Sequence, residues 1–371
     1  MELQSLPENF PAVGGVNLGK TSDASGLAPI TALGNSASLD QWRGLALALV
    51  LISHAFYYTG RVHGIGRVGV NLFFFISGIL VFRSLSKGRG ARKWAVSGEF
   101  WKRRLIRLYP ALVTYVLAVI PLAFLFQHRP ALPPNSDFPH FLMALPFALS
   151  YLMNYASSSP AVAHLWSVSC EMQFYLLAPL IFFLGGCSPS RRNIVWGALL
   201  VLMVISGLSQ PLFGDGKKYH FEFAVWPMML GFCCEYHRAW LERISRKWSH
   251  PLILIGLVML AVSLLLMPLG LTMKKVVIVA GTFVFVPCFL SYVSAQAMPG
   301  LAGRWLGWMG ERTYSIYLWQ QPLTICCYLP IVWQPLGALA SLCVGGAWFY
   351  FTERPFLSSS RRRWVAKPVL T

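Results

Sequence analysis

The sequence predicts an all-α polytopic membrane protein: a bundle of about ten transmembrane helices with one short re-entrant or shallow segment. Hydrophobic residues make up 56% of the 371 residues and charged residues only 12%, about half the share found in soluble domains. The 31 Lys and Arg outnumber the 13 Asp and Glu, and they gather in short runs between apolar segments. This is the loop pattern of multispanning membrane proteins. It argues against nucleic-acid binding, which the net charge of +18 alone could suggest.

The expected elements follow from the apolar runs. Residues 1–40 are rich in small and polar residues and lack the basic and apolar regions of a signal peptide, so we expect a loosely ordered tail. The membrane domain then covers 41–356, and a basic tail, 357–371, closes the chain. The ten expected spans lie near residues 42–59, 65–85, 105–126, 165–186, 193–213, 222–236, 251–270, 275–297, 313–331 and 333–352.

The segment 141–155 decides the topology. It is shorter than the roughly 20 residues that a transmembrane helix needs. If it does not cross, five basic stretches share one side: 87–104, 191–192, 237–247, 304–312 and 361–367. The opposite loops hold little charge, except for the lysines at 217, 218, 274 and 275. By the positive-inside rule we therefore expect both termini in the cytoplasm.

Arg43 and His54 stand out in the first expected span. They are eleven residues apart, so on a helix they share one face and lie about 16 Å apart along its axis. Ionisable side chains within a membrane segment usually face the protein interior and are functional candidates. The alternative is an arginine at the membrane interface together with a packing histidine.

Two further groups could carry chemistry. Glu171 lies in an apolar segment without a cation near it in the sequence, so it either forms a structural ion pair with an arginine or orients a catalytic histidine. Arg103, Arg104 and Arg107 are spaced so that at least two share a helix face. They could bind phosphate, or they could be a topology signal paired with anionic lipid. The eight cysteines show no metal-ligand spacing and are interpreted as packing residues.

Six motifs follow one another in order. They are Arg-x10-His at 43–54, Gly-Val-x-x-Phe-Phe-x-x-Ser-Gly at 69–78, Arg-Arg-x-x-Arg-x-x-Pro at 103–110, Trp-Ser-x-Ser-x-Glu-x-Gln-Phe-Tyr-Leu at 166–176, Tyr-Ser-Ile-Tyr-Leu-Trp at 314–319 and Glu-Arg-Pro at 353–355. Across residues 38–356 the chain resembles acyltransferase family 3, the membrane O-acyltransferases of bacterial surface sugars and some secreted small molecules.

The resemblance implies a ten-helix bundle in the bacterial inner membrane, with cytoplasmic acyl-CoA, most often acetyl-CoA, as co-substrate and no metal. It implies a saccharide or glycolipid hydroxyl as acceptor, and Arg43 and His54 as the essential pair. We expect His54 to act as base, Glu171 to orient it, and Arg43 with Arg103, Arg104 and Arg107 to bind donor phosphates. Two positions depart from the family pattern: Met172 replaces a second acid, and Gln320 replaces a histidine.

Other functions fit parts of the pattern. The same chemistry could act on a secreted small molecule such as a macrolide. A sugar or amphiphile transporter would also have many spans and a few buried charges. Transporters often contain internal repeats, and the two halves of this chain show no convincing self-similarity.

Overall fold

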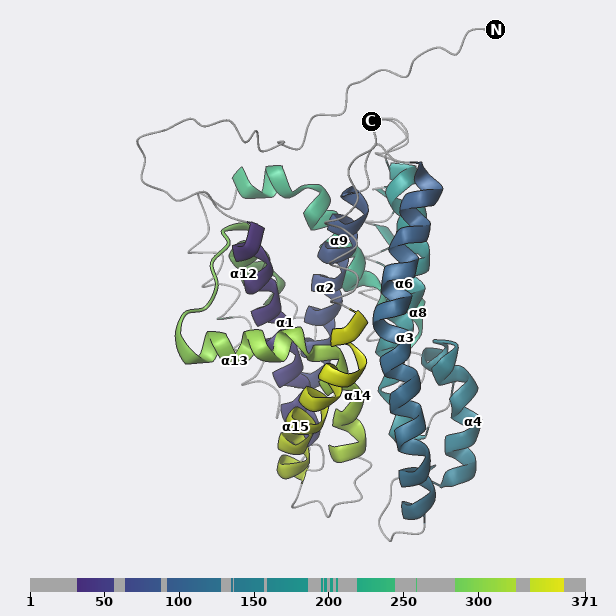
Figure 1. The fold of residues 1–371 in the computed structure, drawn as a ribbon. Coiled ribbons are helices and arrows are strands. Elements are labelled where there is room, and N and C mark those ends of the chain that lie inside the picture. The colour runs from purple at the N-terminus through teal and green to yellow at the C-terminus, as the bar shows by residue number, and fades with distance from the viewer. Residues whose placement is uncertain are drawn as a thin grey trace, which may run out of the picture.

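The computed structural model describes residues 32–56, 64–87, 92–127, 137–156, 159–185, 219–243, 284–324 and 334–356, with a few isolated positions between them. All regular structure in these ranges is helical (Figure 1). Four stretches are long and apolar enough to cross a membrane: Ile65–Ser86, Lys93–Leu125, Pro160–Leu184 and Gln334–Phe356. The prediction of a helical membrane protein is therefore supported, and the count of about ten spans is not confirmed. The expected spans 193–213 and 251–270, the lysines at 217, 218, 274 and 275, and the tail 357–371 lie outside the described residues.

The first helix is shifted from its expected place. Helix α1 is Ala32–Ala55, whereas the apolar run predicted a span at 42–59, so His54 lies in the last turn of the helix. Residues 32–40 are helical although they were expected in the tail. Leu39, 2% exposed, shows the reason, because it packs in a hydrophobic cluster with α2, Ile65–Ser86, and α12, Phe285–Val293.

The basic connector after α2 is helical from Lys93 onward. It forms the start of α3, Lys93–Phe126, a helix of 34 residues and therefore about 51 Å long. That length exceeds the roughly 30 Å of a bilayer core, so α3 is longer than one membrane crossing requires. Helix α4, Phe138–Leu149, packs beside α3 (Figure 1) and has only 12 residues. At about 18 Å it is too short to cross, in keeping with the shallow segment expected there.

The remaining helices complete the bundle. They are η2 (Met153–Tyr155), α5 (Pro160–Ala163), α6 (Leu165–Gly185), α8 (Phe221–Ala224), α9 (Trp226–Tyr236), α13 (Gly300–Glu311), α14 (Thr313–Thr324) and α15 (Gln334–Thr352). Helix α1 packs mainly on α13 and α2, α2 also on α9, and α14 on α15 (Figure 1).

Glycines bring α2 and α9 into backbone contact. A Cβ atom added at Gly78 would lie 2.0 Å from the Met228 carbonyl oxygen, and one at Gly231 would lie 2.0 Å from that of Phe75. No side chain fits at either position, so the small residues expected to permit close packing in the second span do so at Gly78.

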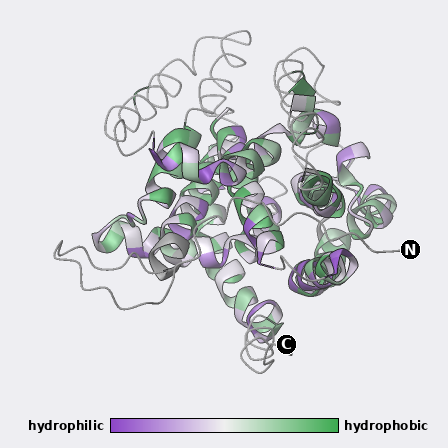
Figure 2. Ribbon diagram, turned by 90° about the horizontal axis from the view of Figure 1, so that it is seen from above, coloured by the Kyte–Doolittle hydropathy of each residue, from purple (hydrophilic) through white to green (hydrophobic). Residues whose placement is uncertain are grey.

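Large apolar side chains are exposed around the bundle. Figure 2, which views it from above, shows hydrophobic residues on the peripheral helices as well as in the interior. A lipid-facing surface needs this distribution, because every side that contacts hydrocarbon must be apolar. The most exposed include Phe351 at 78%, Met143 at 70%, Leu125 at 69%, Leu301 at 63%, Leu117 at 61% and Leu176 at 60%.

Candidate active site

A small basic cavity lies where α1, α2, α3, α6 and α14 meet. It has a volume of about 20 Å³, and four of the residues singled out in the sequence line it: Arg43, Arg104, Arg107 and Glu171. Arg104 and Arg107 are three residues apart, so they share one face of α3. Arg103 is not part of the lining and interacts electrostatically with Glu99 instead.

The three arginines are held in different ways. Arg43 is 8% exposed and donates a hydrogen bond from Nη1 to Asp40 at 3.3 Å. The guanidinium of Arg104 lies 4.8 Å from the centre of the Tyr175 ring, close enough for a cation–π contact. Arg107 Nε is buried and has no hydrogen-bond partner among the described residues. Arg107 therefore keeps a donor available to an anion.

Two buried carboxylates lie near these arginines. Glu171 accepts hydrogen bonds from the hydroxyls of Ser77, at 2.5 Å, and Tyr175. Glu353 is fully buried and accepts the backbone N–H of Ser315 at 3.0 Å and its hydroxyl at 2.5 Å. Glu171 interacts electrostatically with Arg43, and Glu353 with both Arg43 and Arg107. Sequence reasoning did not select Glu353, although it opens the closing Glu-Arg-Pro motif.

His54 is part of a second polar group. Its Nδ1 contacts the side-chain oxygen of Gln320, a fully buried residue of α14. A carbonyl oxygen can only accept, so Nδ1 carries the proton and Nε2 keeps its lone pair. Gln320, which departs from the family pattern, is thus the residue that orients this histidine.

His164 belongs to the same group and was not predicted. It is 2% exposed, packs between the rings of Tyr115 and Tyr317, and interacts electrostatically with His54. The sequence feature that could have indicated His164 is its position two residues before the Trp-Ser motif that carries Glu171.

The predicted contact between Glu171 and His54 is not formed in the structure. Glu171 accepts hydrogen bonds from Ser77 and Tyr175, and His54 contacts Gln320. Glu171 lines both cavities of the site, whereas His54 lines neither.

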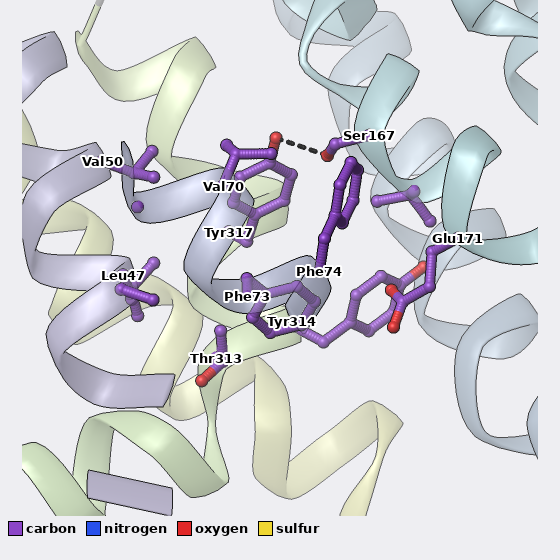
Figure 3. Close-up of a pocket in the computed structure, with 13 residues that line it drawn as sticks. Leu47, Val50, Val70, Phe73, Phe74, Ser167, Glu171, Thr313, Tyr314 and Tyr317 are labelled. Atoms are coloured by element: carbon purple, nitrogen blue, oxygen red, sulfur yellow. Dashed lines mark hydrogen bonds between the residues drawn. The ribbon is translucent and has the colours of Figure 1, made fainter. Parts of the chain in front are cut away.

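An apolar cavity of about 30 Å³ lies beside the basic cavity (Figure 3). The two cavities share Phe73, Glu171 and Tyr314 in their linings, so they are adjacent. At the His54 side, the hydroxyls of Ser167 and Tyr317 are 2.7 Å apart, the contact that is dashed in Figure 3. The full lining is Ala46, Leu47, Val50, Gly69, Val70, Phe73, Phe74, Ser167, Val168, Glu171, Thr313, Tyr314 and Tyr317.

The arrangement therefore has three levels along the bundle. Helix α1 passes through all of them, with Arg43 at the basic cavity, Val50 at the apolar cavity and His54 beyond it. Within the described residues, no group of three or more His, Cys, Asp or Glu side chains is arranged to hold a metal ion. The bundle thus assembles an arginine cavity, an adjacent apolar cavity and an oriented imidazole.

Known proteins share this sequence pattern. The acyltransferase domain family matches residues 36–352. O-acetyltransferase OatA of Staphylococcus aureus is 27% identical over 311 residues, covering 77% of this chain and 50% of the relative. A putative peptidoglycan O-acetyltransferase, YrhL of Bacillus subtilis, is 24% identical over 366 residues, covering 88% of this chain and 56% of the relative. A putative membrane-bound transacylase, BcsY of Komagataeibacter xylinus, is 27% identical over 326 residues, covering 81% and 76%.

The chain spans about half the length of the first two of these relatives. No solved structure matches it. The match over residues 36–352 covers most of the 371 residues, including both cavities and the His54 contact. The chain therefore belongs to acyltransferase family 3.

Proposed function

We propose that this protein is a membrane O-acyltransferase that moves an acyl group from acyl-CoA to a hydroxyl of a saccharide or glycolipid. The proposed acyl group is acetyl. Family membership favours acyl transfer over transport. Two of the relatives are named as O-acetyltransferases, one of them of peptidoglycan, and this supports a sugar polymer as acceptor.

The basic cavity is the proposed site for the phosphates of the donor. Guanidinium groups bind phosphate oxygens through two parallel hydrogen bonds, which favours arginine over lysine at such sites. Arg43, Arg104 and Arg107 meet there from two helices, and Arg107 has an unused Nε–H. The basic start of α3 belongs to the same end of the bundle, so the positive-inside rule puts the donor site at the cytoplasmic side of the bacterial inner membrane.

His54 is the proposed general base. Its Nε2 takes the proton of the acceptor hydroxyl while the hydroxyl oxygen attacks the thioester carbonyl. The carbon–sulfur bond then breaks, and the coenzyme A thiolate takes the proton from the imidazolium. A positioned base of this kind contributes about 10²–10⁴ in rate. Because His54 ends α1 at the side opposite the arginines, the acceptor approaches from the far side of the membrane.

The observation that carries this proposal is the alignment of the arginine cavity, the apolar cavity and the His54–Gln320 contact along one axis. The separation of about 16 Å between the levels of Arg43 and His54 suits a long, flexible thioester arm.

The proposal is tested with protein in liposomes, radiolabelled acetyl-CoA and a panel of peptidoglycan fragments and oligosaccharides. We expect label on a saccharide with the native protein and a loss of about 10²-fold or more with His54→Gln, which hydrogen-bonds without taking a proton. Label transfer by His54→Gln at the native rate would exclude His54 as the base. Mass spectrometry of surface glycans and secreted metabolites, with and without the gene, identifies the acceptor.

A further inference from the structure

We propose that the apolar cavity is the subsite for the acyl chain of the donor, and that Val50 and Val70 limit this chain to two or three carbons. This inference rests on the proposed function and adds to it the residues that set the length of the acyl chain. The cavity (Figure 3) adjoins the arginine cavity and is lined by Val50, one helical turn before His54 on α1, so it is the nearest apolar space for an acyl group held between the two levels.

The chemistry of the lining suits hydrocarbon. Leu47, Val50, Val70, Phe73 and Phe74 form most of its walls. The polar side chains lie at its ends, with Glu171 toward the arginines and the Ser167–Tyr317 hydroxyl pair toward His54. An apolar space between two polar levels favours an alkyl group, because hydrocarbon has no hydrogen bond to lose there.

The size of the cavity sets the limit. Its volume is about 30 Å³, and on the same scale one buried water needs about 10–15 Å³. Two groups of the size of a methyl or methylene fit such a space, so acetyl and propionyl chains fit, whereas each further methylene has to displace a side chain.

The wall between α1 and α2 is formed by close backbone packing. A Cβ atom added at Gly69 would come within 2.5 Å of the Ala46 carbonyl oxygen, so the two backbones are already in contact. Val50 from α1 and Val70 from α2 line the cavity next to this contact and are 4% and 9% exposed. Shortening either side chain enlarges the cavity without changing a polar group of the site.

The test compares Val50→Ala and Val70→Ala with the native protein, using acetyl-, propionyl- and butyryl-CoA as donors. Val81→Ala is the matched control, because Val81 is fully buried on α2 in the same hydrophobic cluster and does not line the cavity. One methylene in a hydrophobic pocket changes specificity by about 10- to 200-fold. We expect the butyryl-to-acetyl rate ratio to rise at least about tenfold in the cavity variants and to stay at the native value in Val81→Ala. An unchanged ratio in the cavity variants, or an equal rise in the control, would overturn the proposal.

A second measurement does not depend on the acceptor. Bromoacetyl-CoA should alkylate Val70→Cys and spare Val81→Cys, as read by mass spectrometry of the peptides that contain each position. Alkylation at position 70 without acyl transfer to any saccharide would retain the acyl subsite and reject the proposed acceptor. Absence of alkylation at position 70, with the protein folded and binding coenzyme A, would reject the subsite itself.

Discussion

At the scale of single residues, the site depends on how each polar side chain is oriented. The contact between His54 and Gln320 sets which nitrogen of the imidazole is protonated. The hydroxyls of Ser77 and Tyr175 fix Glu171 at the border of both cavities. Gln320 and Ser77 come from other helices and could not be inferred from residue spacing, whereas Tyr175 lies four residues after Glu171 on the same helix face.

Replacing Gln320 tests whether it positions the base. Gln320→Leu removes the acceptor for Nδ1–H, so the protonated nitrogen is no longer specified. We expect turnover to fall at least about tenfold, less than the 10²–10⁴ expected for loss of the base, with an unchanged KM for acetyl-CoA. Gln320→Glu keeps an acceptor oxygen and should recover part of the rate. Equal losses in both variants would point to a packing role.

Replacing Glu171 tests whether its negative charge affects anion binding by the nearby arginines. In Glu171→Gln an amide oxygen still accepts from Ser77 and Tyr175, so the unfolding temperature should stay close to the native value. The variant lacks one negative charge beside Arg43, and coenzyme A should therefore bind several-fold more tightly in calorimetry. Weaker binding would show that Glu171 supports the anion site by means other than charge.

At the scale of elements, the basic motif of α3 divides its arginines between two places. Arg104 and Arg107 line the basic cavity, and Arg103 does not. The positions on the helix decide this, since all three residues carry the same charge.

A matched pair on α3 checks that division. Arg107→Ala removes a guanidinium that lines the cavity and whose Nε is buried. It should weaken coenzyme A binding by about tenfold or more, as for a hydrogen bond to a charged group. Arg103→Ala removes the same charge from the same helix and should change binding by less than about twofold. Equal effects in correctly inserted protein would mean that the basic motif acts through its overall charge.

Helix packing is testable at two glycines. Gly78→Ala forces a Cβ atom against the Met228 carbonyl and should destabilise the α2–α9 contact by about 1–3 kcal/mol. Gly98 on α3 has open space around it, so Gly98→Ala should be neutral or stabilising by up to about 1 kcal/mol. Thermal unfolding in detergent measures both. A Gly78→Ala protein as stable as the native one would show that the two helices do not touch at this point.

At the scale of the whole molecule, the proposed mechanism requires that the arginine end of the bundle faces the cytoplasm, where acyl-CoA is found. Reporter tags near residues 20, 95, 245 and 365 should therefore all report the cytoplasm, and a tag near 133 the outside. Opposite results for 95 and 245 would mean that the segment around α4 crosses the membrane and that the topology is wrong.

Composition and periodicity were enough to predict a helical membrane protein, and motif order was enough to indicate its family. The element boundaries were less accurate. Helix α1 begins at Ala32 and α3 at Lys93, each earlier than the apolar runs suggested, because polar residues remain helical where one face packs on the bundle. Four site residues meet at one cavity as residue type suggested, and Arg103 does not.

The sequence by itself determined the chemistry that is present: arginines at one end of apolar runs, a histidine eleven residues further along, and a carboxylate in a membrane segment. Only the tertiary structure decided which of these groups touch. It paired His54 with Gln320, gave Glu171 the partners Ser77 and Tyr175, and brought Glu353 and His164 to the site. The physical reason is that spacing along a chain orders groups on their own helix, whereas contacts between helices depend on register and on the glycines that let backbones meet.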